Sequence, residues 1–241
     1  MHNENSIANN ITDCNIADNI KRVREAIGEA ALKAGRSPGD ITLVAASKTK
    51  PADSVRLAIA AGVDAVGENR VQEMTEKKAL GAYLDAPLHF IGHLQSNKIS
   101  KVVGVCDLIE SVGSLSLMEQ IGKRAVSLGI VQDILIEVNI GKEPQKSGIL
   151  PEQTEEILHI ASETGGVRVL GLMAVPPLYA QNENNCNYFD VMWKLFIDIS
   201  GKKYDNISVQ FLSMGMSDSF YEAIMSGSNM VRIGSAIFGA R

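Results

Sequence analysis

The hydrophobic pattern of the chain changes its period after Gly35. Before that glycine, apolar residues recur at three- and four-residue spacing, at Ile16, Ile20, Val23 and Ile27. This spacing predicts an amphipathic helix that ends near Gly35. After it, short runs rich in β-branched residues alternate with longer stretches of helical pattern, which indicates strands and helices in regular succession.

Eight apolar runs predict strands, over 41–47, 63–67, 88–92, 107–112, 133–140, 167–175, 207–213 and 230–234. The stretches between them predict helices, over 52–61, 69–80, 96–104, 115–128, 152–163, 187–200 and 217–226. In the last of these, Ser217 is expected to cap the helix. Strands that alternate with helices indicate a parallel α/β fold, either an open doubly wound sheet or a closed barrel.

The number of β/α units favours the barrel, because eight units in roughly 200 residues match a small TIM barrel. The first strand is not followed by the G-x-G-x-x-G pattern of dinucleotide-binding sheets. We therefore expect a single (β/α)8 TIM-type barrel domain over 16–241, with an extra N-terminal helix at its start. Residues 1–15 are polar and rich in asparagine, and they are expected to form a flexible segment.

Charge and cysteine usage limit the classes of binding partner and the cellular compartment that the sequence allows. The net charge of −5 gives no electrostatic case for nucleic-acid binding. The three cysteines, Cys14, Cys106 and Cys186, have no C-x-x-C spacing, which favours a reducing compartment. The N-terminus lacks a secretory pattern, and no apolar run reaches the ~18 residues of a membrane span. These features predict a cytoplasmic protein.

Candidate chemistry lies at the carboxyl ends of the predicted strands, where barrels of this kind carry their sites. The first strand runs into Lys48, and the last strand carries Arg232. If the barrel closes, these strands are neighbours, and a cation beside a partly desolvated lysine lowers the pKa of its amine. A neutral amine can form a Schiff base with a carbonyl. Lys50 is the alternative nucleophile, but Pro51 follows it, which places it in the loop.

The segments after strands seven and eight predict a phosphate site, as is common in this architecture. Gly234 allows the backbone to approach a phosphate closely, and Ser213 and Ser235 supply hydroxyl donors. A ligand with one phosphate and one reactive carbonyl fits these residues. Pyridoxal phosphate satisfies this description, and so does a phosphorylated sugar.

Seven segments in order then carry a family resemblance that runs from about residue 16 to the end. They are ASKTKP (46–51), GENRVQE (67–73), HFIGHLQSNK (89–98), VNIGKEPQKSGI (138–149), GLMAVPP (171–177), LSMGMSDSF (212–220) and VRIGSAIFGAR (231–241). Together they resemble the pyridoxal phosphate homeostasis protein family, whose fold is similar to the N-terminal barrel of alanine racemase. The resemblance implies pyridoxal 5'-phosphate (PLP) as cofactor.

The resemblance also implies a role for each matching residue. Lys48 would form the covalent Schiff base, and Arg232 would face the pyridine nitrogen. The other cofactor-binding residues would be Ser213, Gly234 and Ser235 at the phosphate and Asn69 and Met214 along the ring, with Lys146 as a possible accessory outside the primary site. Ser235 stands where threonine is usual in the family, which preserves the hydroxyl.

The resemblance implies a non-catalytic protein of PLP homeostasis that stores, buffers or delivers the cofactor. Alanine racemase takes its second acid/base from an additional domain, for which this chain shows no sequence. One alternative is a stand-alone PLP-dependent amino-acid racemase, with His93 or Tyr179 as the opposing base. An aldolase-type enzyme acting on a sugar phosphate through Lys48 is a weaker alternative.

Partners are expected to be few. PLP is the small-molecule partner, PLP-dependent apo-enzymes are possible transient partners, and the family suggests a monomer. Neither nucleic acid nor membrane is expected. His89 and His93 lie four residues apart, but no third ligand of suitable spacing accompanies them, so no metal site is predicted.

Overall fold

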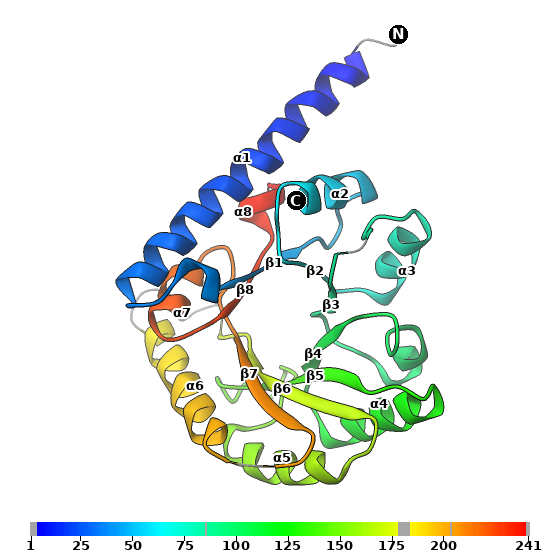
Figure 1. Cartoon of the computed structure of the whole chain (residues 1–241), viewed down its shortest axis with the longest axis vertical. Coiled ribbons are helices and arrows are strands. Elements are labelled where there is room, and N and C mark those ends of the chain that lie inside the picture. Colours follow the sequence, from blue (N-terminus) through cyan, green and yellow to red (C-terminus); the bar gives the residue numbers. More distant parts are fainter. Residues whose placement is uncertain (1–3, 85, 178–183, 203, 240–241) are drawn as a thin grey trace.

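The structure is a computed structural model that describes residues 4–84, 86–177, 184–202 and 204–239. Eight parallel strands pair in sequence order and close into a barrel surrounded by helices (Figure 1). The strands are β1 (Thr42–Ala46), β2 (Ala65–Glu68), β3 (Leu88–Phe90), β4 (Leu108–Val112), β5 (Gln132–Val138), β6 (Val167–Ala174), β7 (Ile207–Ser213) and β8 (Met230–Ile233). The predicted TIM-type barrel and all eight predicted strands are confirmed.

The helices are α1 (Glu4–Lys33), α2 (Ala52–Ala60), α3 (Val71–Ala79), α4 (Leu115–Ser127), α5 (Thr154–Glu163), α6 (Asn184–Ser200), α7 (Phe220–Met225) and α8 (Ser235–Phe238), with 3₁₀ helices η1 (Pro38–Asp40), η2 (Ser96–Lys101) and η3 (Pro151–Gln153). The helix predicted over 96–104 is thus a short 3₁₀ helix. The helix predicted over 217–226 begins only at Phe220. Ser217 therefore does not cap it, and its hydroxyl makes other contacts.

The barrel closes through β1 and β8, where Val44 pairs with Arg232 and Leu43 with Val231. Side chains alternate along each strand, so one set fills the barrel and the other packs against the helices. The inner set forms one buried cluster of Val44, Ala65, Leu108, Leu135, Leu170, Met173 and Met230. The residue-by-residue register could not be predicted from the sequence, but the pairing of the first and last strands was predicted correctly.

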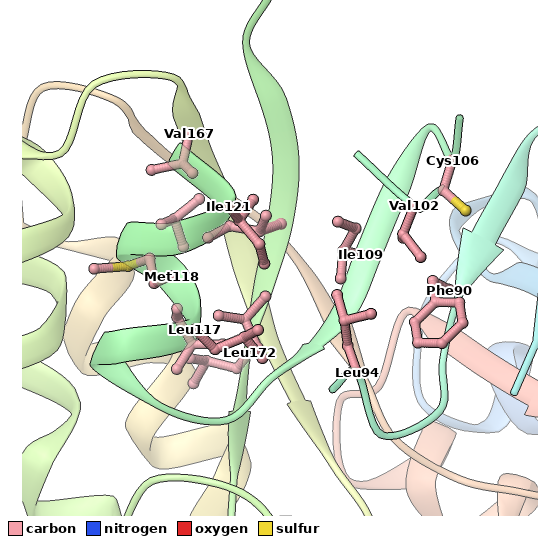
Figure 2. Close-up of a cluster of buried hydrophobic side chains, with 14 of the residues drawn as sticks. Phe90, Leu94, Val102, Cys106, Ile109, Leu117, Met118, Ile121, Val167 and Leu172 are labelled. Atoms are coloured by element: carbon pink, nitrogen blue, oxygen red, sulfur yellow. The ribbon is translucent and has the colours of Figure 1, made fainter. Parts of the chain in front are cut away.

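The outer layer holds the larger part of the core. Figure 2 shows one region of it, in which Phe90 and Ile109 from the barrel face Leu94 and Val102 from the segment around η2. On the other side of the same view, Met118 and other side chains of α4 pack against β6. Burial of Phe90 and Ile109 is complete. This packing holds the strand ends at fixed positions. A site at the mouth, the end of the barrel formed by the carboxyl ends of the strands, requires such fixed positions.

Helix α1 covers the seam between β8 and β1 (Figure 1). Its residues Ile20 and Ile27 are buried beside Leu43 and Val231, and Asn19 Nδ2 donates to the carbonyl oxygen of Ile237 at 2.8 Å. The helix begins at Glu4, earlier than the spacing of apolar residues predicted. The flexibility of residues 1–15 stays a prediction. No helix within the described ranges is both long and apolar enough to cross a membrane.

Candidate cofactor site

The turn after β1 carries Lys48, which is half-buried. The side chain of Ser47 leaves the barrel: its Oγ donates to Glu68 Oε1 at 2.5 Å, in the layer between the barrel and α3. Val44 faces the barrel interior and Ser47 faces outward, and Lys48 follows in the turn at the carboxyl end of β1. Lys50 Nζ instead donates to the carbonyl oxygen of Phe238 at 2.9 Å. This contact engages Lys50 with the C-terminal segment and favours Lys48 as the mouth lysine.

Arg232 lies inside the barrel on β8 and is almost fully buried. One terminal nitrogen donates to Ser213 Oγ, and the other donates to the carbonyl oxygen of Ala174 at 3.0 Å. Ser213 Oγ in turn donates to Glu110 Oε2 at 2.6 Å, and His89 Nδ1 lies 2.7 Å from Glu110 Oε1. We call these four side chains, of His89, Glu110, Ser213 and Arg232, the interior cluster. It places Ser213 against Glu110, although the sequence predicted it at a phosphate.

Burial and charge act in opposite directions within the interior cluster. Burial raises the pKa of Glu110, but the hydrogen bond with His89 and the charge of Arg232 outweigh it, so the pKa lies below its usual value. Burial lowers the pKa of Arg232, and Glu110 opposes that shift. Burial also raises the pKa of Glu137 on β5, against the charges of Arg232 and His93. The interior cluster therefore contains a carboxylate whose pKa is lowered, and β5 carries a second carboxyl group whose pKa is raised.

A cradle of backbone N–H groups follows β8. The N–H groups of Gly234 and Ala236 both point to Ser217 Oγ, each at 3.3 Å. A Cβ added to Gly234 would lie 3.2 Å from the carbonyl oxygen of Ala46, so the two chain segments approach more closely than a side chain normally permits. Gly234 and Ser235 are thus brought beside the end of β1. Ser217, which the sequence suggested only as a helix cap, joins them.

The remaining predicted residues lie at other points of the same end of the barrel. Asn69 follows β2, and its Oδ1 is buried without a hydrogen-bond partner among the described residues. Met214 is fully buried directly after β7. Lys146 Nζ lies 2.5 Å from Glu143 Oε2 and donates to the carbonyl oxygen of Pro176 at 3.2 Å.

The two histidines named from the sequence lie in different parts of the structure, and the tyrosine lies outside the described residues. His89 belongs to the interior cluster, whereas His93 is exposed with its Nδ1 2.9 Å from Ser147 Oγ. Tyr179 lies outside the described residues. Within the described part of the chain, no three His, Cys, Asp or Glu residues are grouped as metal ligands would be.

Three residues of the site were missed by the sequence analysis: Glu110, Glu137 and Ser217. Glu110 had a signal, because it is the only charged residue inside the apolar strand LIESV. A charge in such a strand is buried only with partners. Its partners His89, Ser213 and Arg232 come from three other strands, so the grouping follows from the closed barrel alone.

Comparison with known proteins gives first the class to which this barrel and its site belong. The family model described as "Alanine racemase, N-terminal domain" matches residues 11–241. A protein of Aquifex aeolicus (strain VF5) named "Pyridoxal phosphate homeostasis protein" is 40% identical over 227 residues, which cover 94% of this chain and 99% of that one. The chain belongs to the pyridoxal phosphate homeostasis protein family, as the seven sequence segments predicted.

Solved structures agree with this assignment. A protein of unknown function from Bifidobacterium adolescentis superposes with a TM-score of 0.89 at 37% identity, covering 95% of this chain and 96% of that one. PipY of Synechococcus elongatus PCC7942, solved with PLP bound, superposes with a TM-score of 0.81 at 31% identity and covers 93% of this chain and 100% of its own. The curated Aquifex aeolicus relative carries a homeostasis name rather than an enzyme name.

The residues present fit PLP on three observations of this structure. The convergent N–H groups of Gly234 and Ala236 suit a phosphate oxygen. The unpartnered Oδ1 of Asn69 is an acceptor beside the mouth, and Lys48 supplies an amine from the adjoining turn. Each group lies at the carboxyl ends of the strands, where ligands of this fold bind.

Proposed function

We propose that this chain binds PLP covalently through Lys48 and stores, buffers or delivers it within the cell. The single observation that carries the proposal is the β1–β8 seam, where Gly234 lies against Ala46, two residues before Lys48. This approach supports a site in which the amine of Lys48 and the phosphate cradle serve one ligand, since PLP has an aldehyde and a phosphate on one ring. When bound, PLP supplies the electrophilic aldehyde, and the chain supplies the amine and the anion site.

We propose Ser217, Gly234 and Ser235 for the phosphate. The two N–H groups that donate to Ser217 Oγ support this part of the proposal, because an anionic phosphate oxygen accepts the same kind of hydrogen bond. Ser213 also remains proposed for the phosphate, and its hydroxyl accepts a hydrogen bond from Arg232. Asn69 and Met214 remain proposed neighbours of the ring, and Lys146 remains a proposed accessory.

Arg232 is expected to weaken the cofactor as an electron sink without excluding racemisation, because alanine racemase is similar in this respect. A guanidinium only donates hydrogen bonds, so an arginine at the pyridine nitrogen disfavours its protonation. A protonated nitrogen is what makes the cofactor an effective electron sink. The buried carboxylate of Glu110 keeps Arg232 in place, with 3.6 Å between Glu110 Oε2 and the nearest guanidinium nitrogen. The homeostasis name of curated relatives such as the Aquifex aeolicus protein supports a holding role over turnover.

The covalent linkage is tested with the absorbance of purified protein and PLP before and after borohydride reduction, followed by mass spectrometry. Lys48→Ala is expected to abolish the visible band and the modification. Lys50→Ala is the matched control, because Lys50 lies two residues away and contacts Phe238 instead. Modification of Lys50, or a wild-type protein without any modified lysine, contradicts the proposal.

The racemase alternative has its own test. Exchange of the α-hydrogen of amino acids with deuterated solvent reports proton abstraction directly. We expect no exchange with the wild-type protein loaded with PLP. Exchange that disappears in His93→Ala would replace the homeostasis role with turnover.

Location and assembly complete the proposal. We propose a cytoplasmic monomer that meets PLP-dependent apo-enzymes only transiently. The buried free thiol of Cys106 supports a reducing compartment. Analytical ultracentrifugation is expected to give one species at the mass of a single chain, 25.9 kDa.

A further inference from the structure

A second buried group of charged side chains lies outside the barrel, between β2 and α3. Glu68 is fully buried at the end of β2, and Lys77 on α3 is 6% exposed. Lys77 Nζ donates to Glu68 Oε1 at 2.7 Å, and the hydroxyl of Tyr83 donates to the same oxygen at 3.0 Å. The other oxygen, Glu68 Oε2, has no hydrogen-bond partner among the described residues. One buried carboxylate oxygen therefore lacks a hydrogen bond, which is unfavourable if the ion pair serves stability alone.

The ion pair of Glu68 and Lys77 also makes hydrogen bonds to the turn that carries Lys48. Lys77 Nζ also donates to the main-chain carbonyl oxygen of Ser47 at 2.8 Å, and Ser47 Oγ donates to Glu68 Oε1. Ser47 is the residue directly before Lys48. A buried ion pair contributes little net stability compared with apolar residues of the same volume, but it fixes geometry when its hydrogen bonds are directed. Here the directed bonds reach the peptide that carries the mouth lysine.

The residue after Lys48 is held as well. Thr49 has φ of +64°, a left-handed conformation that is rare outside glycine. Its N–H donates to Glu73 Oε2 on α3 at 2.7 Å. Both chain neighbours of Lys48 are thus bound by side chains of β2 and α3. We call the contacts of Glu68, Lys77 and Glu73 with this turn the turn clamp.

We propose that the turn clamp positions the amine of Lys48 for linkage to the cofactor aldehyde. This inference rests on the proposed function and names residues that act on Lys48 through the backbone. None of the three touches the cofactor cradle of Gly234. They are positioning residues, and their loss slows the covalent step without weakening the first, non-covalent binding of PLP.

Stopped-flow absorbance separates the two steps, since the apparent dissociation constant reports the first complex and the limiting rate reports linkage. The variant Glu68→Gln/Lys77→Met removes both buried charges together, so neither remains unpaired. We expect an about tenfold lower limiting rate, because one directed hydrogen bond to the turn is lost. The apparent dissociation constant is expected to stay unchanged.

Tyr83→Phe is the matched control. It removes a different hydrogen bond of the same carboxylate and leaves the carbonyl of Ser47 untouched. It is expected to lower the melting temperature while the limiting rate stays at the wild-type value. Glu73→Ala, on a side chain that is 20% exposed, tests the other arm of the clamp with little risk to folding, and it is expected to slow linkage as well.

The outcomes separate this inference from the function on which it rests. A wild-type protein that forms no linkage at Lys48 overturns both. Linkage in the wild type, with unchanged limiting rates in Glu73→Ala and in the folded double variant, overturns the positioning role alone. A limiting rate that falls equally in Tyr83→Phe overturns it too, because the effect would then follow stability rather than contact with the turn.

Discussion

The protein contains two buried groups of charged side chains, one inside the barrel and one between β2 and α3, and their hydrogen bonds differ. In the interior cluster both oxygens of Glu110 have partners: His89 on one and Ser213 on the other. In the turn clamp, Glu68 concentrates its contacts on one oxygen and leaves the other without a partner among the described residues. The interior cluster holds a side chain, Arg232, whereas the clamp holds a backbone turn. Buried charges can therefore serve either the electrostatics of a site or the position of its backbone.

The largest expected effect comes from breaking the interior cluster. Arg232→Met leaves the buried carboxylate of Glu110 without its cation, so the free energy of unfolding should fall by about 3–5 kcal/mol in urea denaturation. Arg168→Met is the control, because that arginine pairs with Asp133 at the surface, and it should cost less than about 1 kcal/mol. Equal losses in the two variants would remove the distinction.

Replacing one partner of the Glu68–Lys77 pair should lower the free energy of unfolding more than replacing both partners. Lys77→Met leaves Glu68 buried without its cation, and we expect a loss of about 3 kcal/mol in the free energy of unfolding. Glu68→Gln/Lys77→Met should lose less than this, because no unpaired charge remains. A double variant that is less stable than the single variant would show that the pair stabilises the fold outright.

Acid should weaken the interior cluster through Glu110. Its pKa is lowered in the folded state, so its contribution to stability is present above the unfolded value of about 4.5 and is lost as the pH falls through the folded pKa. Unfolding free energies measured from pH 6 down to about pH 3 should therefore drop more steeply in the wild type than in Glu110→Gln. Parallel curves would contradict the shift.

The smallest expected effect is a gain in stability, in contrast to the losses above, and it comes from Glu137. Burial raises the pKa of Glu137 above its ordinary 4.5, so its contribution to stability is full below that value and is lost as the pH rises through the folded pKa. Glu137→Gln should therefore be more stable than the wild type at neutral pH, and the gain should vanish in acid. Chemical denaturation at both pH values measures it, and a gain that persists in acid would point to packing instead.

Much of the fold could be predicted because its signals are local. Apolar runs such as LIESV and DILIEV predict strands from neighbouring residues alone, and their alternation with helices limits the architecture to a few forms. Element ends were less predictable. Ser217 looks like a helix cap, but α7 begins at Phe220, since the hydroxyl of Ser217 receives N–H groups from the segment after β8.

Residues of the proposed site could be named from the sequence only where one segment carries the whole signal. Lys48 stands at a strand end, and Gly234 and Ser235 stand after the last strand, so each could be named from its position. Ser213 has an equally suggestive position, but its side chain bonds to Glu110, which lies 103 residues earlier. No local pattern encodes a contact over that separation.

The amino-acid sequence alone determined the number and order of the strands, the lysine at the first strand end and the family, because each depends on neighbours along the chain. The tertiary structure decided which charges share a partner: Glu110 with Arg232 inside the barrel, and Glu68 with Lys77 outside it. The physical reason is that closing the barrel and packing α3 against it remove these groups from water. Only then does each charge require the particular partner that the fold brings to it.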